Sequence, residues 1–90
     1  MMDWDKLRIF HAVAAAGSLT HAGETLRLSQ SAVSRQIRAL EDSLSATLFH
    51  RHARGLILTE QGELLFEATS SMNRRLETAS ARIRDSEEEV

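Results

Sequence analysis

The 90-residue sequence contains no cysteine and no proline. It also has no apolar run long enough to cross a membrane. Without cysteine, disulfide bonds and cysteine-ligated zinc sites are excluded, and a reducing compartment fits best. The first ten residues, MMDWDKLRIF, carry acidic side chains where a secretion signal needs basic ones. We therefore expect a soluble, cytoplasmic protein.

Catalytic and metal-binding patterns are missing as well. The sequence has no credible nucleophile–base pair and no glycine-rich phosphate loop. His50 and His52 have the spacing of two metal ligands on a strand, but no third ligand follows at a suitable spacing. His11 and His21 fall on separate predicted helices. We therefore expect no enzymatic activity, no cofactor and no metal site.

The net charge of −2 argues against a nucleic-acid-binding protein, but the charge is unevenly distributed. Residues 1–58 hold seven lysines and arginines against five acidic residues, a balance of +2. Residues 59–90 hold four arginines against eight acidic residues, a balance of −4. We interpret the two segments as different units: a small domain over 1–58 and a separate helix over 59–90.

Hydrophobic spacing, capping residues and glycines predict four helices and one β-hairpin. The expected helices span residues 3–16, 19–26, 30–44 and 60 onward, and the hairpin strands span 48–51 and 55–58. Three residues with N-capping side chains precede the later helices: Ser18, Ser29 and Thr59. The first helix has an apolar stripe that we expect to be buried: Trp4, Leu7, Phe10, Val13 and Ala14. This order predicts a mostly α-helical fold, a winged helix-turn-helix of three helices and a two-stranded wing, followed by a long dimerisation helix.

The helix predicted over 30–44 has two contrasting faces. Its apolar residues follow a 4-3-4 spacing: Val33, Ile37, Leu40 and Leu44. Its other side carries mostly hydroxyls and arginines: Gln30, Ser31, Ser34, Arg35, Arg38 and Asp42. In a helix-turn-helix the second helix enters the DNA major groove, where arginine pairs with guanine and glutamine with adenine. We therefore expect double-stranded DNA as the partner; the alternative is an ordinary solvated face.

The expected tip of the wing, residues 51–55, is a second candidate site. An arginine can insert into a narrow, A·T-rich minor groove, and Arg54 is the candidate for this contact. Arg51 is expected to meet a phosphate, with His52 beside it; ordinary surface charge is the alternative. Further residues expected to contact or support the DNA backbone are Ser18, Thr20, Ser29 and Arg38. For the first three of these, helix capping alone is the competing role.

The final helix repeats its seam positions every seven residues. These positions are Leu65, Thr69, Met72, Leu76, Ala79, Ile83, Ser86 and Val90. Its first turns, through Leu64 or Phe66, are expected to pack on their own domain. Beyond Met72 little core is left to cover, so the repeat predicts a homodimer. The residues predicted to form the dimer contact are Leu65, Met72, Leu76, Ala79 and Ile83.

One stretch closely resembles the N-terminal DNA-binding domain of LysR-type transcriptional regulators, and within that family it is similar to the VtlR/LsrB subgroup: LRIFHAVAAAGSLTHAGETLRLSQSAVSRQIRALEDSLSATLFHRHARGLILTEQG. The resemblance implies a bacterial regulator that binds an interrupted A·T-rich palindrome as a homodimer, paired through its linker helices. The base contacts that it implies are Gln30, Ser31, Ser34 and Arg35, with Arg54 in the minor groove. It also implies a C-terminal effector-binding domain for a small molecule, for which this chain has no room. We therefore expect a DNA-binding fragment.

Three residues depart from the family's pattern: Gly23 replaces the usual alanine, Ser45 replaces the glycine after a helix, and Gln61 replaces a small residue. Gly23 is expected to weaken a helix interior, and Ser45 to strain a helix end slightly. None of the three is an expected base contact. The competing hypothesis is a winged-helix module that binds another protein without specific DNA binding, which the negative net charge supports.

Overall fold

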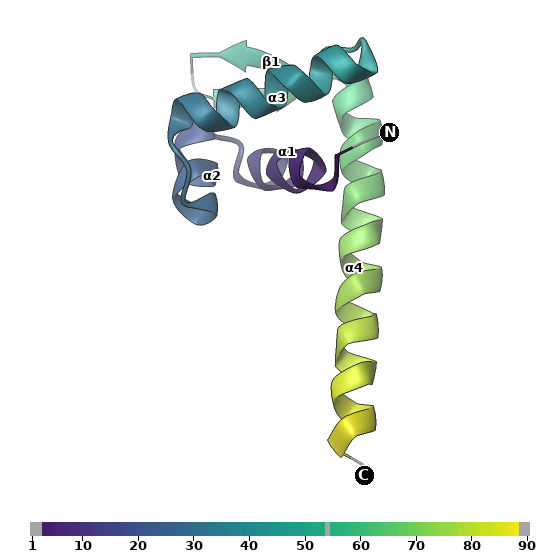
Figure 1. The fold of residues 1–90 in the computed structure, drawn as a ribbon. Helices are drawn as coiled ribbons and strands as arrows, with labels where there is room; N and C mark the ends of the chain where they lie inside the picture. Colours follow the sequence, from purple (N-terminus) through teal and green to yellow (C-terminus); the bar gives the residue numbers. More distant parts are fainter. Residues whose placement is uncertain (1–2, 54, 89–90) are drawn as a thin grey trace.

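The computed structural model describes residues 3–53 and 55–88 (Figure 1). The elements in chain order are α1 (Trp4–Ala16), α2 (Leu19–Leu26), α3 (Gln30–Leu44), β1 (Phe49–His52), β2 (Gly55–Leu58) and α4 (Glu60–Glu88). The first three helices and the two antiparallel strands gather on one side of the upper part of α4. The rest of α4 continues alone, so the molecule measures 52 × 25 × 22 Å. The predicted fold class, a mostly helical winged helix-turn-helix with a long final helix, is confirmed.

Local capping sets the starts of the helices. The Asp3 carboxylate accepts a hydrogen bond from the Asp5 amide at 2.9 Å, so Asp3 is the extended N-cap of α1 and α1 begins one residue later than predicted. The hydroxyls of Ser18 and Ser29 accept hydrogen bonds from the amides three residues ahead, at 3.3 and 3.1 Å. The predicted bounds of α2 and α3 are therefore confirmed to the residue.

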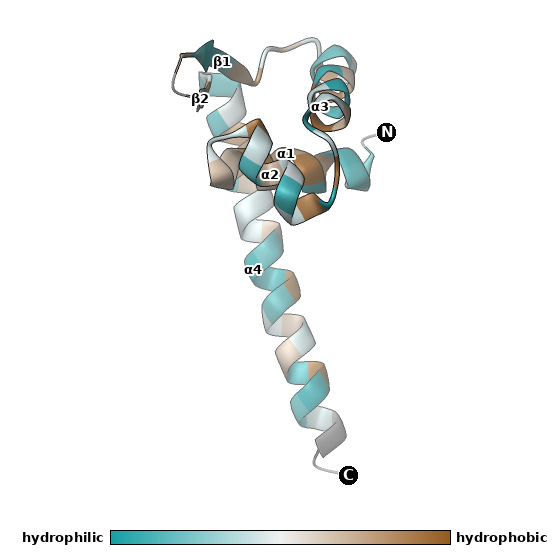
Figure 2. Ribbon diagram, turned by 90° about the vertical axis from the view of Figure 1, so that its left-hand side faces the viewer, coloured by the Kyte–Doolittle hydropathy of each residue, from teal (hydrophilic) through white to brown (hydrophobic). Residues whose placement is uncertain are grey.

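The core lies where α1, α2, α3 and the wing meet. Its buried apolar residues are Leu7, Ile9, Phe10, Val13, Ala22, Val33, Ile37, Leu40, Leu48 and Phe49. The rings of Phe10 and Phe49 lie 5.4 Å apart between centroids, which ties the first helix to the first strand. Figure 2 shows the most apolar ribbon segments on these three helices. This packing gives α3 a fixed buried side and leaves its opposite side to solvent.

The prediction that Trp4 belongs to the buried stripe was wrong. Trp4 is the first residue of α1 and is 69% exposed. The core lies deeper along α1, at Leu7, Phe10 and Val13, so the indole at the helix end has no core to enter. It lines a groove between α1 and α4 instead, together with Leu76.

The sequence predicted that the first strand begins at Leu48, but it begins at Phe49. The backbone of Leu48 is already in use: its amide donates to the Glu41 carboxylate at 2.7 Å, and its carbonyl accepts from the Thr59 amide at 3.0 Å. Strand pairing therefore starts one residue on, with Phe49 opposite Leu58.

The wing is anchored to the turn between α1 and α2. The Leu56 amide donates to the Gly17 carbonyl at 3.2 Å. Gly55 has a φ of 136°, and a Cβ atom there would lie 2.6 Å from the same carbonyl oxygen. Any other residue at position 55 would be strained and would push the wing away from the helices.

The start of α4 is held by Thr59, as its predicted capping role requires. Its hydroxyl accepts from the Gly62 amide at 2.9 Å and donates to the Thr47 carbonyl at 2.6 Å. At Gly62 a Cβ atom would collide with the Leu48 carbonyl oxygen, so glycine allows α4 to pass close to the loop before β1. These contacts set the direction in which α4 leaves the domain.

Two of the departures from the family's pattern have a structural setting. A Cβ atom at Gly23 would lie 2.7 Å from the Leu28 carbonyl oxygen, so here the glycine allows the turn after α2 to fold back closely. Ser45 ends α3 in the left-handed region with a φ of 52°, the conformation for which slight strain was expected of a residue other than glycine. Gln61 is exposed, and nothing in the structure explains its replacement of a small residue.

Candidate nucleic-acid interface

The outer side of α3 presents a row of polar side chains. Val33, Ile37 and Leu40 are buried on the inner side and hold the helix against α1 and α2. The exposed residues on the outer side are Gln30, Ser31, Arg35 and Arg38, with Ser34 half-buried at the edge. The structure thus brings the helix residues predicted to contact DNA to one solvent-facing surface. We call this surface the α3 face.

A shallow groove joins the α3 face to the wing. It is lined by residues of the start of α2, the start of α3 and the hairpin, among them Ser18, Thr20, Gln30, Arg51 and His52. Five residues from separate segments, all predicted to contact or support DNA, therefore line one surface depression. Hydroxyls, an amide and a guanidinium are groups that bind phosphates and base edges.

The sequence did not predict the direction of Arg51. Its Nη2 donates a hydrogen bond to the hydroxyl of Ser34 at 3.1 Å, across 17 residues of chain. A signal for this contact exists in the strand, because alternate residues of a strand point to the same side. Phe49 is buried, so Arg51, two residues on, also points toward the helices.

The other wing residues provide less evidence for the interface. Arg54, the predicted minor-groove residue, lies outside the described residues. His50 and His52 are exposed on β1. Within residues 3–53 and 55–88, no group of three histidine or acidic side chains is placed to hold a metal ion.

The predicted seam of α4 divides into two parts. Leu65 is half-buried and packs against the core of its own domain, and Thr69 is buried there. The Thr69 hydroxyl lies 2.8 Å from Nδ1 of His11, a contact between α1 and α4 that the sequence did not predict. These contacts arise because the first turns of α4 run alongside α1.

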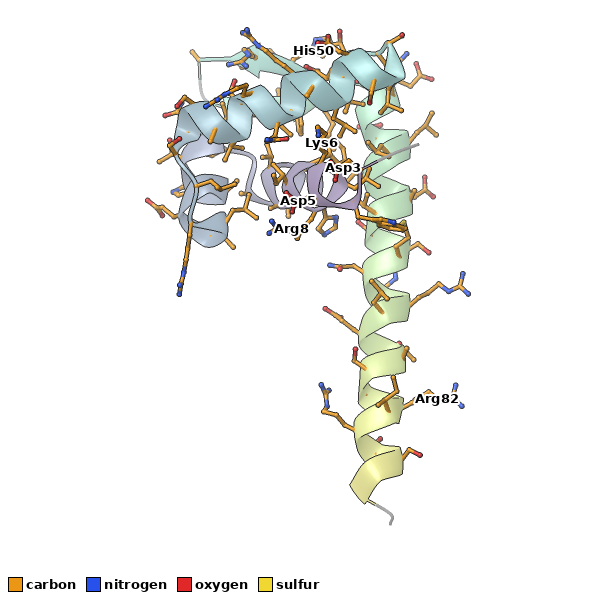
Figure 3. The ribbon with its side chains drawn as sticks, viewed as in Figure 1. Asp3, Asp5, Lys6, Arg8, His50 and Arg82 are labelled. Carbon is orange, nitrogen blue, oxygen red and sulfur yellow. The ribbon has the colours of Figure 1, made fainter. Side chains whose placement is uncertain are left out.

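Farther along α4, apolar side chains are exposed. Leu76 and Ile83 are 63% and 64% exposed, Ala79 between them is exposed, and Met72 is half-buried beside the Trp4 groove. Figure 2 shows isolated apolar positions on this otherwise polar segment. Arg82 points away from the winged domain (Figure 3).

Within the described helices, none is both long and apolar enough to cross a membrane.

Comparison with known proteins relates this arrangement to one family. The family model described as "Bacterial regulatory helix-turn-helix protein, lysR family" matches residues 4–63. The chain is 44% identical over 71 residues to the RuBisCO operon transcriptional regulator of Allochromatium vinosum. The matched residues cover 79% of this chain and 24% of that protein. The chain thus spans about a quarter of the length of that curated relative.

Solved structures show the same similarity. The DNA-binding domain of CbnR in its complex with DNA has a TM-score of 0.77 and 33% identity, covering 94% of this chain and 98% of that one. Full-length LysG from Corynebacterium glutamicum has a TM-score of 0.87 and 28% identity, covering all of this chain and 31% of that one. The similarity therefore extends through α4.

Proposed function

We propose, since this chain belongs to the lysR family of bacterial regulatory helix-turn-helix proteins, that it binds double-stranded DNA sequence-specifically and so regulates transcription. The observation that carries the proposal is the α3 face: Gln30, Ser31 and Arg35 are exposed on a helix whose other side is buried. A helix held in this way can enter the major groove without rearranging the core. The structural relative bound to DNA supports this assignment.

The side chains of the α3 face have distinct proposed roles. Arg35 is suited to a bidentate contact with guanine and Gln30 to one with adenine. Ser31 and Ser34 are short, so they let the helix approach the base edges closely. Arg38, farther along the helix, is assigned to a phosphate.

Residues outside α3 complete the proposed interface. Arg54 is proposed to enter the minor groove from the wing. Contacts with the DNA backbone, or support of the residues that contact DNA, are assigned to Ser18, Thr20, Ser29, Arg51 and His52. In the free protein Ser18 and Ser29 already cap helices, so a phosphate would have to share their hydroxyls.

We also propose a homodimer through α4, with residues 1–58 as the DNA-binding domain and 59–90 as the linker helix. Leu76 and Ile83 are large, apolar and exposed on the segment of α4 beyond the domain, and a second copy would cover them. Two domains joined in this way would bind an interrupted, A·T-rich palindrome. Ile83→Glu should convert the dimer to a monomer in sedimentation velocity, whereas Thr78→Glu on the exposed helix surface should not.

The natural test is selection of the chain on a randomised duplex pool at physiological salt. A motif with dyad symmetry supports the dimeric DNA binder, and a motif without the dyad keeps the α3 assignment but removes the dimer. Affinity should also fall with salt, with a log–log slope near −0.9 for each phosphate neutralised. No enriched motif would favour the competing protein-interaction module.

Location and chemistry follow from the same proposal. A regulator that binds the bacterial chromosome works in the cytoplasm, at the nucleoid. We propose no enzymatic activity for the chain, since the relatives are named as transcriptional regulators and activators. A hydrolase or transferase activity that copurifies with the chain and is lost in a point variant would contradict the proposed lack of enzymatic activity.

A further inference from the structure

The hydrogen bond between the wing and α3 has a defined polarity. Nη2 of Arg51 lies 3.1 Å from Oγ of Ser34. A guanidinium carries donors only, so the serine oxygen must accept. The bond therefore occupies a lone pair of Ser34 and leaves the hydroxyl hydrogen free to point elsewhere.

Both ends of this bond are held in place by the fold. Ser34 follows the fully buried Val33 on α3. Arg51 lies opposite Leu56 in the hairpin, and the Leu56 amide is the group that donates to the Gly17 carbonyl. The strand is thus anchored at the residue that pairs with Arg51, which holds the guanidinium near α3.

The hydroxyl hydrogen of Ser34 has no acceptor among the described residues. A serine or threonine within a helix commonly donates to a carbonyl of the preceding turn. Among the described residues three do so: Ser43 donates to the Leu40 carbonyl at 2.8 Å, Thr25 to the His21 carbonyl at 3.2 Å and Thr69 to the Phe66 carbonyl at 3.1 Å. Ser34 makes no such bond, so its hydrogen is available to a ligand at the α3 face.

We infer that Arg51 is a positioning residue, which orients the Ser34 hydroxyl as a hydrogen-bond donor toward the base that Ser34 meets. In the major groove guanine offers two acceptors, N7 and O6, whereas cytosine offers an amino donor. A serine held as a donor therefore distinguishes G·C from C·G at one base pair. This inference rests on the proposed function and adds a wing residue to the determinants of sequence preference.

A phosphate contact by Arg51 predicts a different outcome. An arginine that only neutralises a phosphate strengthens binding to every sequence and contributes about 0.9 to the salt slope. A positioning arginine changes the preference at one base pair. The two roles are thus separated by measuring base preference and salt slope together.

The experiment repeats the duplex selection with the wild-type chain and with Ser34→Ala, Arg51→Met and the double variant. Arg38→Met is the matched control, because it removes an exposed arginine from the same face. We expect Ser34→Ala and Arg51→Met to lose the same preference at the same base pair, by about 2- to 10-fold, the range of one neutral hydrogen bond. The double variant should lose no more than either single variant. The control should keep the preference and weaken all sequences equally.

Several results would overturn the inference. An Arg51→Met variant that keeps every base preference but has a smaller salt slope would make Arg51 a phosphate contact. Retention of the preference in Ser34→Ala would remove Ser34 from base recognition. A wild-type chain that selects no motif would overturn the proposed function itself, and this inference with it.

A measurement without DNA tests the contact separately. In the free protein, Arg51→Met should shift the NMR signals of Ser34, whereas Arg82→Met, on the far part of α4, should leave them in place. Thermal unfolding checks the fold, which we expect both variants to keep because both arginines are exposed. Unchanged Ser34 signals in a folded Arg51→Met variant would show that Arg51 does not hold Ser34.

Discussion

Replacing Arg35 by alanine removes an exposed guanidinium from the α3 face without disturbing the core. Arg35 makes no hydrogen bond or ion pair within the described residues, and the neighbours that anchor its helix, Val33 and Ile37, are buried. Alanine and arginine are both good helix formers. The free energy of unfolding should therefore change by less than about 0.5 kcal/mol.

The expected loss of DNA affinity is much larger than this change in stability. A bidentate contact between arginine and guanine is worth about 1–3 kcal/mol of discrimination. At 1.4 kcal/mol per tenfold, one lost contact weakens binding by roughly 5- to 150-fold. A dimer loses the contact in both half-sites, so the total is about 2–6 kcal/mol.

Fluorescence anisotropy with the selected duplex and a scrambled duplex measures both affinity and preference. Arg82→Ala is the matched control, because it removes the same charge from an exposed position that points away from the domain (Figure 3). Arg35→Ala should bind the selected duplex much more weakly and lose most of its preference over the scrambled duplex. Arg82→Ala should keep the wild-type preference.

Two results would refute this reasoning. If folded Arg35→Ala binds its selected duplex as tightly as the wild type, α3 does not enter the groove as proposed. If Arg82→Ala loses as much affinity as Arg35→Ala, the effect belongs to net charge and not to a base contact.

Three further predictions concern stability and protonation. Phe10→Ala removes a fully buried ring and should lower the free energy of unfolding by about 3–5 kcal/mol in urea denaturation; a loss under 1 kcal/mol would contradict the packing. Thr69→Val removes the buried hydroxyl that meets His11 and should cost about 1–3 kcal/mol in the same assay, with no change if that contact is absent in solution. The hydrogen bond from Lys6, at 3.1 Å, and that from a backbone amide hold the pKa of Asp3 below its ordinary value, so Lys6→Met should raise this pKa in an NMR titration. Because the folded-state pKa is the lower one, the stability that Asp3 contributes is present above its unfolded pKa and is lost as the pH falls through the folded pKa; an unchanged titration would remove Lys6 as the cause.

Much of the fold could be predicted because its signals are local. The starts of α2 and α3 follow from Ser18 and Ser29, whose hydroxyls accept hydrogen bonds from amides three residues ahead. The buried side of α3 follows from apolar spacing along one helix. Trp4 had the same spacing but lies outside the core, because burial at a helix end depends on which other elements reach it.

The candidate site was predictable to a similar extent. Gln30, Ser31 and Arg35 are exposed as the helix periodicity requires, and their contacts with bases stay predictions. The bond from Arg51 to Ser34 could not be read from either segment alone, since it spans 17 residues and depends on where the wing packs.

By itself the sequence determined the helices, the two sides of α3 and the resemblance to one family, since these depend on residues close together along the chain. Only the tertiary structure decided that Arg51 meets Ser34, where the wing rests on Gly17, and how far α4 packs on its own domain before its apolar residues become exposed. The physical reason is that these features depend on hydrogen bonds and packing between elements distant in sequence, whose geometry is settled only when the core closes.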